Sequence, residues 1–281
     1  MGKHKKNLPQ EFSVSERGED IDERTRGSKV ATIAGASFFT ISAAVSIFLI
    51  VFTIVFFFSR VLGPSMMLIL NADFYPGHTN TDAVIVNRFR TPQINDIIVT
   101  RFYRDTPPPS HQAYRWQQSG NRWFQLYIKR LIAVGGDRIF VERDSVDNDL
   151  FNLYVNGTRF VEHRDVDLTH WGQNRDDPRW NYFTNFHNVI HNIGNYRNHT
   201  HNQPWAHMVD DSNPLRPELV IPSTHIFYMG DNRLESLDGR HFGPQPASWV
   251  VGVAVNIARN NQSLPAWLWS RFVHYITFQW V

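Results

Sequence analysis

The sequence predicts a mainly β protein: an antiparallel, barrel-like β domain that follows one N-terminal transmembrane helix and carries a loop-rich insert. Residues 30–59 contain no charged side chain, which indicates a helix that lies in lipid. Beyond them, short runs rich in Val, Ile, Phe and Tyr are separated by turn residues, as in antiparallel strands. We expect a tail at 1–29, a transmembrane helix at 30–59 and a β-rich domain at 60–281, in which a core of 60–162 and 221–258 flanks an insert at 163–220.

The composition excludes several classes of protein. The 28 basic and 26 acidic side chains among 281 residues leave a net charge of +2, so the sequence predicts no broad basic surface for nucleic acid. Cysteine is absent, which rules out disulfides, thiolate metal ligands and a cysteine nucleophile. Covalent catalysis by this chain would therefore use an oxygen or nitrogen nucleophile.

The uncharged segment is long enough to cross a bilayer, since about 20 apolar residues suffice. A buried core helix is one alternative, but soluble helices rarely stay uncharged on every face over such a length. A cleaved secretory signal is another, but the apolar run is too long and no small-x-small cleavage site follows it. We therefore expect a permanent, single-pass anchor in contact with membrane lipid.

The charges around the anchor predict its orientation. Seven Lys or Arg residues precede it, whereas only Arg60 lies in the twenty or so residues that follow. By the positive-inside rule, the tail is cytoplasmic and the β domain lies on the outer face of the membrane. We expect this membrane to be the cell (inner or cytoplasmic) membrane and its outer face to be periplasmic or equivalent.

Seven runs account for the predicted β structure. They are 82–89, 96–102, 123–134, 138–142, 153–160, 226–229 and 249–257. In the fifth run, Asn156-Gly157 separates two apolar stretches, a strong signal for a tight β-hairpin. Residues 105–122 contain three consecutive prolines and predict an exposed loop. Residues 264–281 predict an interfacial helix or a last strand at the membrane surface.

A serine lies just beyond the anchor, in the turn-forming sequence at 63–67. This position would put the Ser65 hydroxyl at the outer surface of the bilayer, where a substrate still held in the membrane would present itself. A serine in a Gly-Pro turn is more often a turn former or a cap. The position alone leaves both interpretations open.

A lysine lies within an apolar predicted strand. Strand alternation puts Tyr127, Lys129 and Leu131 on one face of that strand. The lysine is therefore either a solvated edge residue or a desolvated amine. A free lysine, with a pKa of about 10.4, cannot accept a serine proton at neutral pH, but burial that lowers the pKa by about 2–3 units would leave a useful fraction neutral.

A polar, glycine-punctuated loop follows the predicted strand at 226–229. Residues 230–240 bring Gly, Asp, Asn, Arg and Ser together at close spacing. Taken alone, this pattern is typical of a turn with surface ion pairs.

Together and in this order, these elements resemble the type I signal peptidase (leader peptidase) family of Ser-Lys dyad serine proteases. The resemblance rests on the single anchor followed by Ser-Met and on the aspartate-led strand at 96–99. It also rests on Lys-Arg-x5-Gly-Asp at 129–137 and on Gly-Asp-Asn-Arg-x2-Ser-x-Asp-x-Arg at 230–240. It covers roughly 60–162 and 221–258.

The resemblance implies a mechanism without metal or cofactor. Ser65 would attack the scissile carbonyl, and Lys129 would take its proton and return it to the leaving amine. Ser236 would hydrogen-bond the lysine amine and orient it. The backbone N–H of Ser65 would donate to the oxyanion.

The same resemblance implies supporting roles for further residues. Structural ion pairs would join Arg130 to Asp231 and Asp238 to Arg240. Five residues would line shallow pockets for small side chains at the first and third positions before the cut: Val61, Met66, Leu70, Tyr127 and Ile128. The implied substrates are signal peptides of exported pre-proteins, cut after an Ala-x-Ala type of sequence.

The sequence departs from the family pattern at four places. Residues 68–70 replace a common Pro-Thr-Leu, and Gly239 stands where many members have serine. Gly63 stands where some members supply a second oxyanion donor from a serine, and Asn95 where many have glycine. The oxyanion hole would then use backbone donors alone or another group.

Histidines raise an alternative. Seven of the 13 lie between His163 and His207, including two pairs, His187 with His191 and His199 with His201. Such pairs can ligate zinc when a carboxylate completes the shell, but the His-Glu-x-x-His signature is absent, so we expect no metal. Two alternatives stay open: a zinc peptidase built on the insert, and an inactive membrane-anchored relative that acts as a binding scaffold. The sequence does not indicate an oligomeric state.

Overall fold

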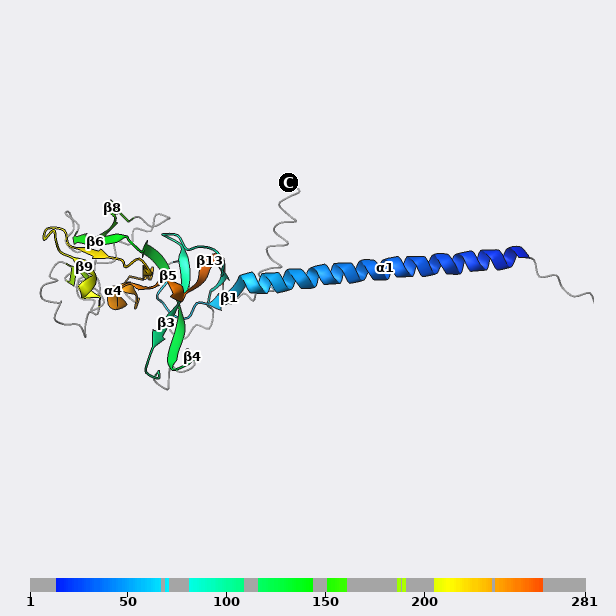
Figure 1. Cartoon of the computed structure of the whole chain (residues 1–281), viewed down its shortest axis with the longest axis horizontal. Helices are drawn as coiled ribbons and strands as arrows, with labels where there is room; N and C mark the ends of the chain where they lie inside the picture. Colours follow the sequence, from blue (N-terminus) through cyan, green and yellow to red (C-terminus); the bar gives the residue numbers. More distant parts are fainter. Residues whose placement is uncertain are drawn as a thin grey trace, which may run out of the picture. The chain divides into compact units, whose positions relative to one another are not determined.

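The structure is a computed structural model, and it describes residues 14–66, 69–70, 81–108, 116–143, 151–160, 186–187, 189–190, 205–233 and 236–259. The chain divides into two compact units, Met1–Ile54 and Val55–Val281. Figure 1 labels the helices and strands of both. Each unit is considered by itself below.

The first unit consists of the long helix α1 (Val14–Val55). Its Ser28–Val55 segment has a mean hydropathy of 2.6, and its large apolar side chains, such as Phe38 and Phe39, are exposed. It is the one helix among the described residues that is long and apolar enough to cross a membrane.

The bounds of α1 differ from the predicted 30–59 at both ends. The helix begins at Val14, within the predicted tail. It ends at Val55, and Phe56–Arg60 forms strand β1 instead. Aromatic residues suit a strand when a partner edge is available, and Phe56 lies opposite Asn87 of a neighbouring strand. The first 13 residues of the predicted tail lie outside the described residues.

The second unit is built on an eight-stranded sheet in the order β1-β2-β13-β3-β5-β11-β12, with β4 paired to β5. The strands are β1 (Phe56–Arg60), β2 (Ala83–Asn87), β3 (Ile97–Arg104), β4 (Gln117–Ser119), β5 (Arg122–Val134), β11 (His225–Met229), β12 (Gln245–Pro246) and β13 (Val250–Ala258). All of these pairings are antiparallel. The predicted mainly antiparallel β class is confirmed.

A smaller sheet of five strands has the order β8-β7-β6-β10-β9. Its strands are β6 (Arg138–Arg143), β7 (Phe151–Val155), β8 (Thr158–Arg159), β9 (Val209–Asp210) and β10 (Glu218–Val220). Between β7 and β8, Asn156 and Gly157 have φ values of 52° and 79°. Positive φ at both central residues is what a tight hairpin turn requires, so the predicted hairpin is confirmed.

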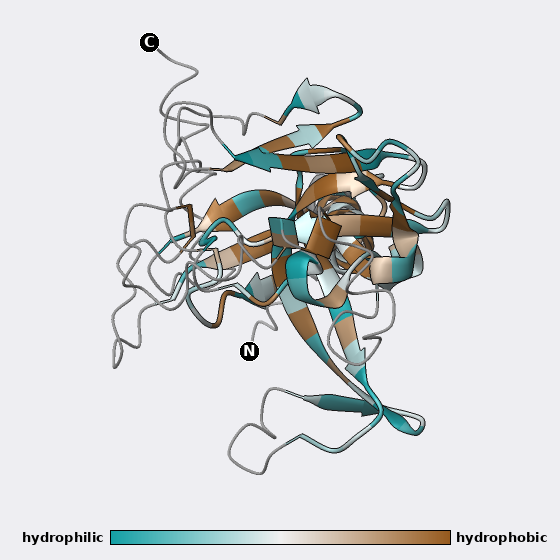
Figure 2. Ribbon diagram, turned by 90° about the vertical axis from the view of Figure 1, so that its left-hand side faces the viewer, coloured by the Kyte–Doolittle hydropathy of each residue, from teal (hydrophilic) through white to brown (hydrophobic). Residues whose placement is uncertain are grey.

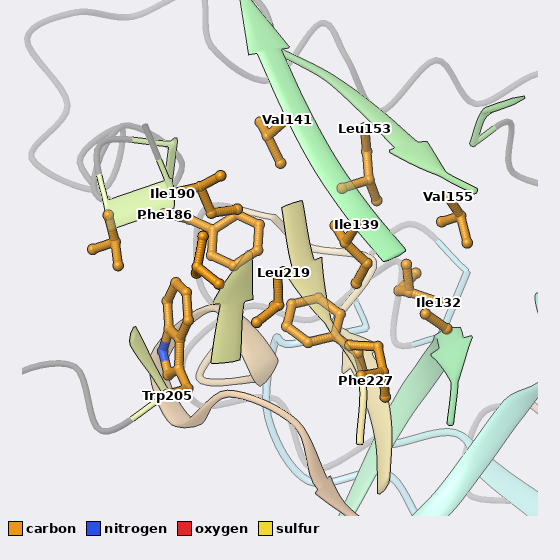
Figure 3. Close-up of a cluster of buried hydrophobic side chains, with 14 of the residues drawn as sticks. Ile132, Ile139, Val141, Leu153, Val155, Phe186, Ile190, Trp205, Leu219 and Phe227 are labelled. Atoms are coloured by element: carbon orange, nitrogen blue, oxygen red, sulfur yellow. The ribbon is translucent and has the colours of Figure 1, made fainter. Parts of the chain in front are cut away.

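The described part of the predicted loop-rich insert at 163–220 packs with the core. Leu219 of β10 lies opposite Ile139 of β6, so the end of the insert completes the second sheet. Figure 3 shows Phe186 and Trp205 packed in one cluster with Phe227 of β11. Strands of two and three residues are too short to show alternation, which explains the missed boundary. The rest of the insert, 163–185, 188 and 191–204, lies outside the described residues, as do 109–115 and 264–281.

Apolar clusters cover both faces of the eight-stranded sheet. Figure 2 shows that apolar residues recur along the strands. Val99 belongs to one cluster and its neighbour Ile98 to another, because successive residues of a strand point to opposite faces. Strand β5 contributes to both, through Ile128 and Leu131. A polar side chain from the middle of β5 is therefore surrounded by apolar core.

Candidate active site

A cleft of about 460 Å³ lies beside strand β5. One wall is the segment 58–65, which runs from β1 into the following turn, and the other is 125–129 of β5. Gln117 and Leu237 also line it. Two extended segments thus face each other across a space with room for a peptide strand.

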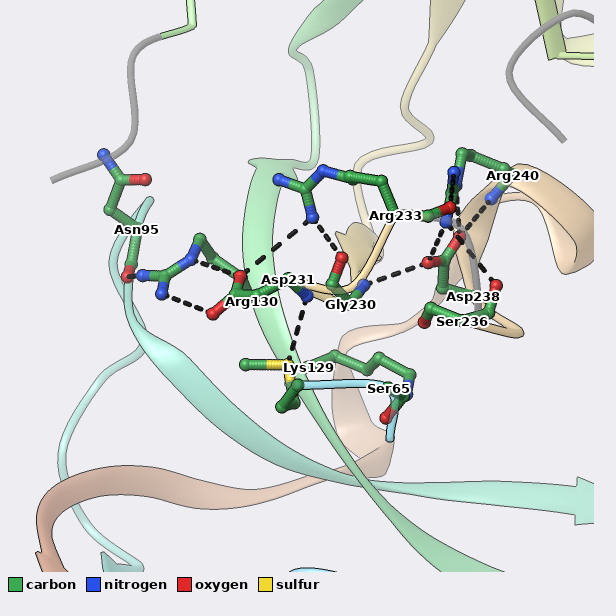
Figure 4. Close-up of polar contacts among 11 residues, drawn as sticks. Ser65, Asn95, Lys129, Arg130, Gly230, Asp231, Arg233, Ser236, Asp238 and Arg240 are labelled. Carbon is green, nitrogen blue, oxygen red and sulfur yellow. Dashed lines mark hydrogen bonds and ion pairs between the residues drawn. The ribbon is translucent and has the colours of Figure 1, made fainter. Parts of the chain in front are cut away.

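Ser65 and Lys129 meet at one end of this cleft. The Lys129 amine donates a hydrogen bond of 2.8 Å from Nζ to Oγ of Ser65. The lysine side chain is only 3% exposed, and the nearby strand residues Ile128 and Leu131 are buried and uncharged. Figure 4 shows the Lys129 side chain lying beside Ser65.

Burial lowers the pKa of Lys129 from its usual value to about 8. The carboxylates of Asp238 and Asp231 raise this pKa, and the Arg240 guanidinium lowers it, but burial outweighs them. At a pKa of about 8, about a tenth of the amine is neutral at pH 7, against about one part in three thousand for a free lysine. The amine can therefore accept a proton near neutral pH.

An aromatic ring forms the floor beside the amine. The Nζ atom of Lys129 lies 5.0 Å from the centre of the Tyr127 ring, and that ring stacks on Phe102 with centroids 5.0 Å apart. Such a cation–π contact favours the charged amine, which opposes part of the effect of burial. The stack also fixes the position of Tyr127 in the cleft wall.

The residue after the lysine holds a second loop in place. Arg130 donates two hydrogen bonds to Asp231, of 2.8 Å and 2.7 Å, and a third of 2.7 Å to the carbonyl of Asn95. Both side chains of the ion pair are buried. Asn95 has a φ of 75°, a conformation that asparagine tolerates better than most residues, which accounts for its place where glycine is common.

A second buried ion pair lies close by. Asp238 accepts hydrogen bonds from Nε and Nη2 of Arg240, each 2.9 Å long, and from the backbone N–H of Gly230 at 2.9 Å. Burial alone would raise the pKa of Asp238, but the Arg240 guanidinium and these hydrogen bonds hold that pKa well below its usual range. The pair fixes both ends of the loop 230–240 (Figure 4).

The start of this loop is hydrogen-bonded to the turn that carries Ser65. Asn232 donates from its backbone N–H to the carbonyl of Ser65 and from Nδ2 to the carbonyl of Pro64, both at 3.1 Å. A Cβ atom on Gly230 would lie 2.4 Å from that Ser65 carbonyl and 2.2 Å from Oγ of Ser236. Only glycine fits there, so the approach of the loop to Ser65 depends on Gly230.

The structure distributes the predicted site residues unevenly. Tyr127, Ile128 and Val61 line the cleft, as expected for pocket residues. Met66 and Leu70 do not: both are fully buried and pack on Val84 and Val86 of β2 in the core. Their apolar side chains are covered by the sheet, which removes them from the cleft surface.

The position of Ser236 also differs from the expectation. Its hydroxyl is buried, and it has no hydrogen-bond partner in the described part of the chain. The structure shows no hydrogen bond between Lys129 and Ser236, and the amine donates to Oγ of Ser65.

Sequence reasoning missed several residues around the site. Gly230 and Asn232 were part of a quoted motif but had no assigned role. Leu237 is an apolar residue within a polar stretch of the sequence, which could have indicated an apolar contact surface. In the structure its side chain is 52% exposed. Phe58 and Ser59 were missed because the sequence assigned them to the helix, and Arg60 and Leu62 had no assigned role.

The described residues contain no group of three His, Cys, Asp or Glu side chains that could hold a metal ion. His187 packs against the Phe151 ring, with centroids 5.4 Å apart. The other histidines of the two pairs, His191, His199 and His201, lie outside the described residues.

Comparison with known proteins agrees with this architecture. The family model described as "Signal peptidase, peptidase S26" matches residues 35–258. The chain therefore belongs to the signal peptidase (peptidase S26) family, and the resemblance inferred from the sequence is confirmed.

Individual relatives match over shorter stretches. Signal peptidase IB of Staphylococcus aureus strain Mu50 is 29% identical over 148 residues, which cover 53% of this chain and 56% of the relative. For strain MRSA252 the identity is 30% over 126 residues, covering 45% and 49%. The matches span about half the length of these relatives. The solved structure of a signal peptidase I from Enterococcus faecalis V583 has 20% identity and a TM-score of 0.29, covering 59% of this chain and 98% of that chain.

Proposed function

We propose that this chain is a membrane-bound serine endopeptidase that removes N-terminal signal peptides from exported pre-proteins through a Ser65–Lys129 dyad. The observation that carries the proposal is the 2.8 Å hydrogen bond between a buried, readily neutralised amine and a serine hydroxyl. Membership of the signal peptidase family supports the same substrate class. An inactive relative that acted only as a binding scaffold would not require Ser65 and Lys129 to be hydrogen-bonded in this way.

In the proposed mechanism, neutral Lys129 accepts the Ser65 proton as Oγ attacks the scissile carbonyl, and an acyl-enzyme forms. The protonated amine then gives its proton to the leaving amine of the new N-terminus. A water molecule, activated by the same lysine, hydrolyses the acyl-enzyme. The backbone N–H of Ser65 is the proposed oxyanion donor.

The cleft suggests how an extended peptide binds. Among the described strands, none pairs with the cleft-facing edge of β5 between Gln125 and Lys129. The N–H of Leu131 donates to the carbonyl of Asp96 beside β3, so alternation along β5 leaves the amides of Leu126 and Ile128 facing the cleft. A substrate strand can hydrogen-bond to these groups, as in β-strand addition.

The chemistry of the walls fits an apolar substrate with small side chains near the cut. Leu62, Leu126 and Leu237 line the cleft and are 60%, 38% and 52% exposed, an unusual density of exposed leucine. Beside the dyad, the bulky side chains of Tyr127 and Ile128 form part of the cleft wall. We therefore propose that residues with small side chains are preferred at the first and third positions before the cut.

We further propose that α1 anchors the protein in the cell membrane in a single pass, with its N-terminus in the cytoplasm and the catalytic unit on the outer face. The 28-residue apolar segment Ser28–Val55 exceeds the length needed to cross a bilayer. The excess of Lys and Arg before it supports this direction.

The pH dependence of cleavage tests the role of Lys129. Because the base acts in its neutral form, kcat/KM for a pre-protein in detergent micelles should rise about tenfold per pH unit from pH 6 and level off above pH 8. A profile that stays flat from pH 6 to 10 would contradict a lysine base. Activity that persists in the presence of a chelator would, in the same assay, exclude the zinc peptidase alternative.

Gly230→Ala tests whether the close approach of the loop 230–232 to Ser65 matters for catalysis. The added methyl group would meet the Ser65 carbonyl at 2.4 Å, so the turn must move and lose its alignment with Lys129. We expect kcat to fall by about 10²-fold, the effect of a misplacement of about 1 Å, with a much smaller change in KM. Gly35→Ala is a control, because its Cβ would meet nothing within 4 Å and its backbone is helical. Equal kcat values for the wild type and Gly230→Ala would remove the positioning role.

A further inference from the structure

One edge of strand β5 is covered at both ends and open in the middle. Strand β3 pairs with residues 123–130 of β5 and occupies the opposite edge along that length. On the first edge, β4 pairs with residues 122–124 and β11 pairs with residues 130–134. Among the described strands, none covers the five positions 125–129 that lie between β4 and β11 on this edge. This gap forms one wall of the cleft beside the proposed dyad.

Strand β4 forms the far boundary of the gap. It is one arm of a tight hairpin in which Ser119 lies opposite Arg122 and Gly120 has a φ of 60°, as a two-residue turn that begins with glycine requires. At the start of β4, Gln117 lies opposite Phe124 and lines the cleft. In Figure 1, β3, β4 and β5 project together from the rest of the sheet. Strand β4 therefore occupies the positions at which a longer added strand would continue along β5.

Alternation fixes how many backbone groups the gap offers to a bound strand. The N–H of Leu131 donates to the carbonyl of Asp96, and the carbonyl of Leu131 accepts from the N–H of Asn95. Odd-numbered residues of β5 thus direct their backbone groups toward β3, and even-numbered residues direct theirs toward the other edge. Within the gap, the even-numbered residues are Leu126 and Ile128. At a rise of about 3.3 Å per residue, the gap is about 17 Å long, so an added strand pairs with these two residues before it meets β4.

We propose that β4 is a stop for the substrate strand and limits the part of a pre-protein that pairs with β5 before the cut to about five residues. The inference rests on the proposed function, because it takes the residues before the cut to run along the cleft from the dyad toward β4. The next pairing position on this edge, Phe124, is already occupied by Gln117. Strand β4 thereby sets the length of the extended segment between the cut and the apolar segment of a signal peptide.

A length series of peptides tests the stop. The peptides have three, five, seven or nine residues before the same cut and are lengthened only with threonine, which is uncharged and favours a strand. Each peptide is bound to the full-length Ser65→Ala protein in detergent micelles, and its Kd is measured by fluorescence anisotropy. Because Ser65→Ala binds without cleaving, a failure of the dyad does not affect this measurement.

A second set of variants removes the stop in the Ser65→Ala background. Gln117 and Ser119 lie opposite even-numbered residues of β5, so their N–H groups face β5, and the double change Gln117→Pro with Ser119→Pro deletes both donors. Gln118→Pro is the matched control, because Gln118 lies opposite Trp123, whose backbone groups face β3. All three residues of β4 are exposed. We therefore expect these variants to stay folded, which circular dichroism checks.

In the Ser65→Ala protein, Kd should fall about fivefold or more from three to five residues and change by less than about twofold from five to nine, because the open edge is then filled. In the double proline variant, Kd should fall about threefold or more again from five to seven residues. Gln118→Pro should keep the parent profile. Affinity that keeps rising beyond five residues in the parent, or a double variant that keeps the parent profile, would overturn the stop alone. Absence of binding at every length would overturn the proposed function together with it.

Discussion

Lys129→Met should abolish cleavage while the protein stays folded. Methionine has about the length of the apolar part of the lysine side chain but has no group to accept the Ser65 proton. We therefore expect kcat to fall by about 10⁴-fold or more, as it does when one member of a catalytic unit is removed. Ser65→Ala should cause a loss of similar size. The measurement is single-turnover cleavage of a pre-protein in micelles, with each variant checked by circular dichroism.

The same variant gives an independent readout in its stability. Because the pKa of Lys129 is about 8 in the folded chain and 10.5 when solvated, the wild type is penalised below pH 8 and regains stability as the pH rises from 8 to 10.5. Lys129→Met lacks this penalty, so it should be more stable than the wild type at pH 7 by up to about 3 kcal/mol. The difference should disappear by pH 10.5. A variant that is inactive but equally stable at all pH values would indicate that the amine is solvated.

Asp238→Ala should produce the largest loss of stability of any single change in the site. Asp238 is fully buried and holds Arg240, which is 2% exposed, with bonds of 2.9 Å. Removal of the carboxylate leaves a buried guanidinium without its counter-charge, at a cost of about 3–5 kcal/mol. Thermal unfolding of the full chain in micelles should show a decrease in Tm of roughly 6–20 °C.

Asp105→Ala is the matched control for this experiment. Asp105 also pairs with an arginine, Arg122, at 2.8 Å, but it is 81% exposed. The loss of such a surface pair should cost less than about 1 kcal/mol. The difference between the two variants should narrow in acid, because the lowered pKa of Asp238 contributes stability above about pH 4 that is lost as the pH falls. Similar Tm values for both variants would show that the buried Asp238–Arg240 pair contributes no more to stability than the exposed pair.

The sequence by itself determined the long apolar segment, the order of the main strands and the family. Alternation of apolar and polar residues is local, so the strands at 97–104 and 122–134 could be predicted within a few residues. The spaced motifs at 129–137 and 230–240 each fixed several residue types at once, so together with Ser-Met after the anchor they allowed Ser65, Lys129 and both ion pairs to be predicted through the family resemblance. The long uncharged run predicted a membrane helix, and the observed helix α1 begins further toward the N-terminus, at Val14.

Only the tertiary structure decided how these parts meet. Ser65 and Lys129 are 64 positions apart, and no local pattern encodes a 2.8 Å contact across such a distance. The low pKa of Lys129 depends on its burial, which strands and loops distant in sequence produce together. The same holds for Met66, whose covering by β2 removed it from the cleft, and for Leu219, whose pairing with β6 placed the end of the insert in the core. Burial is a property of the assembled fold, whereas alternation is a property of each segment.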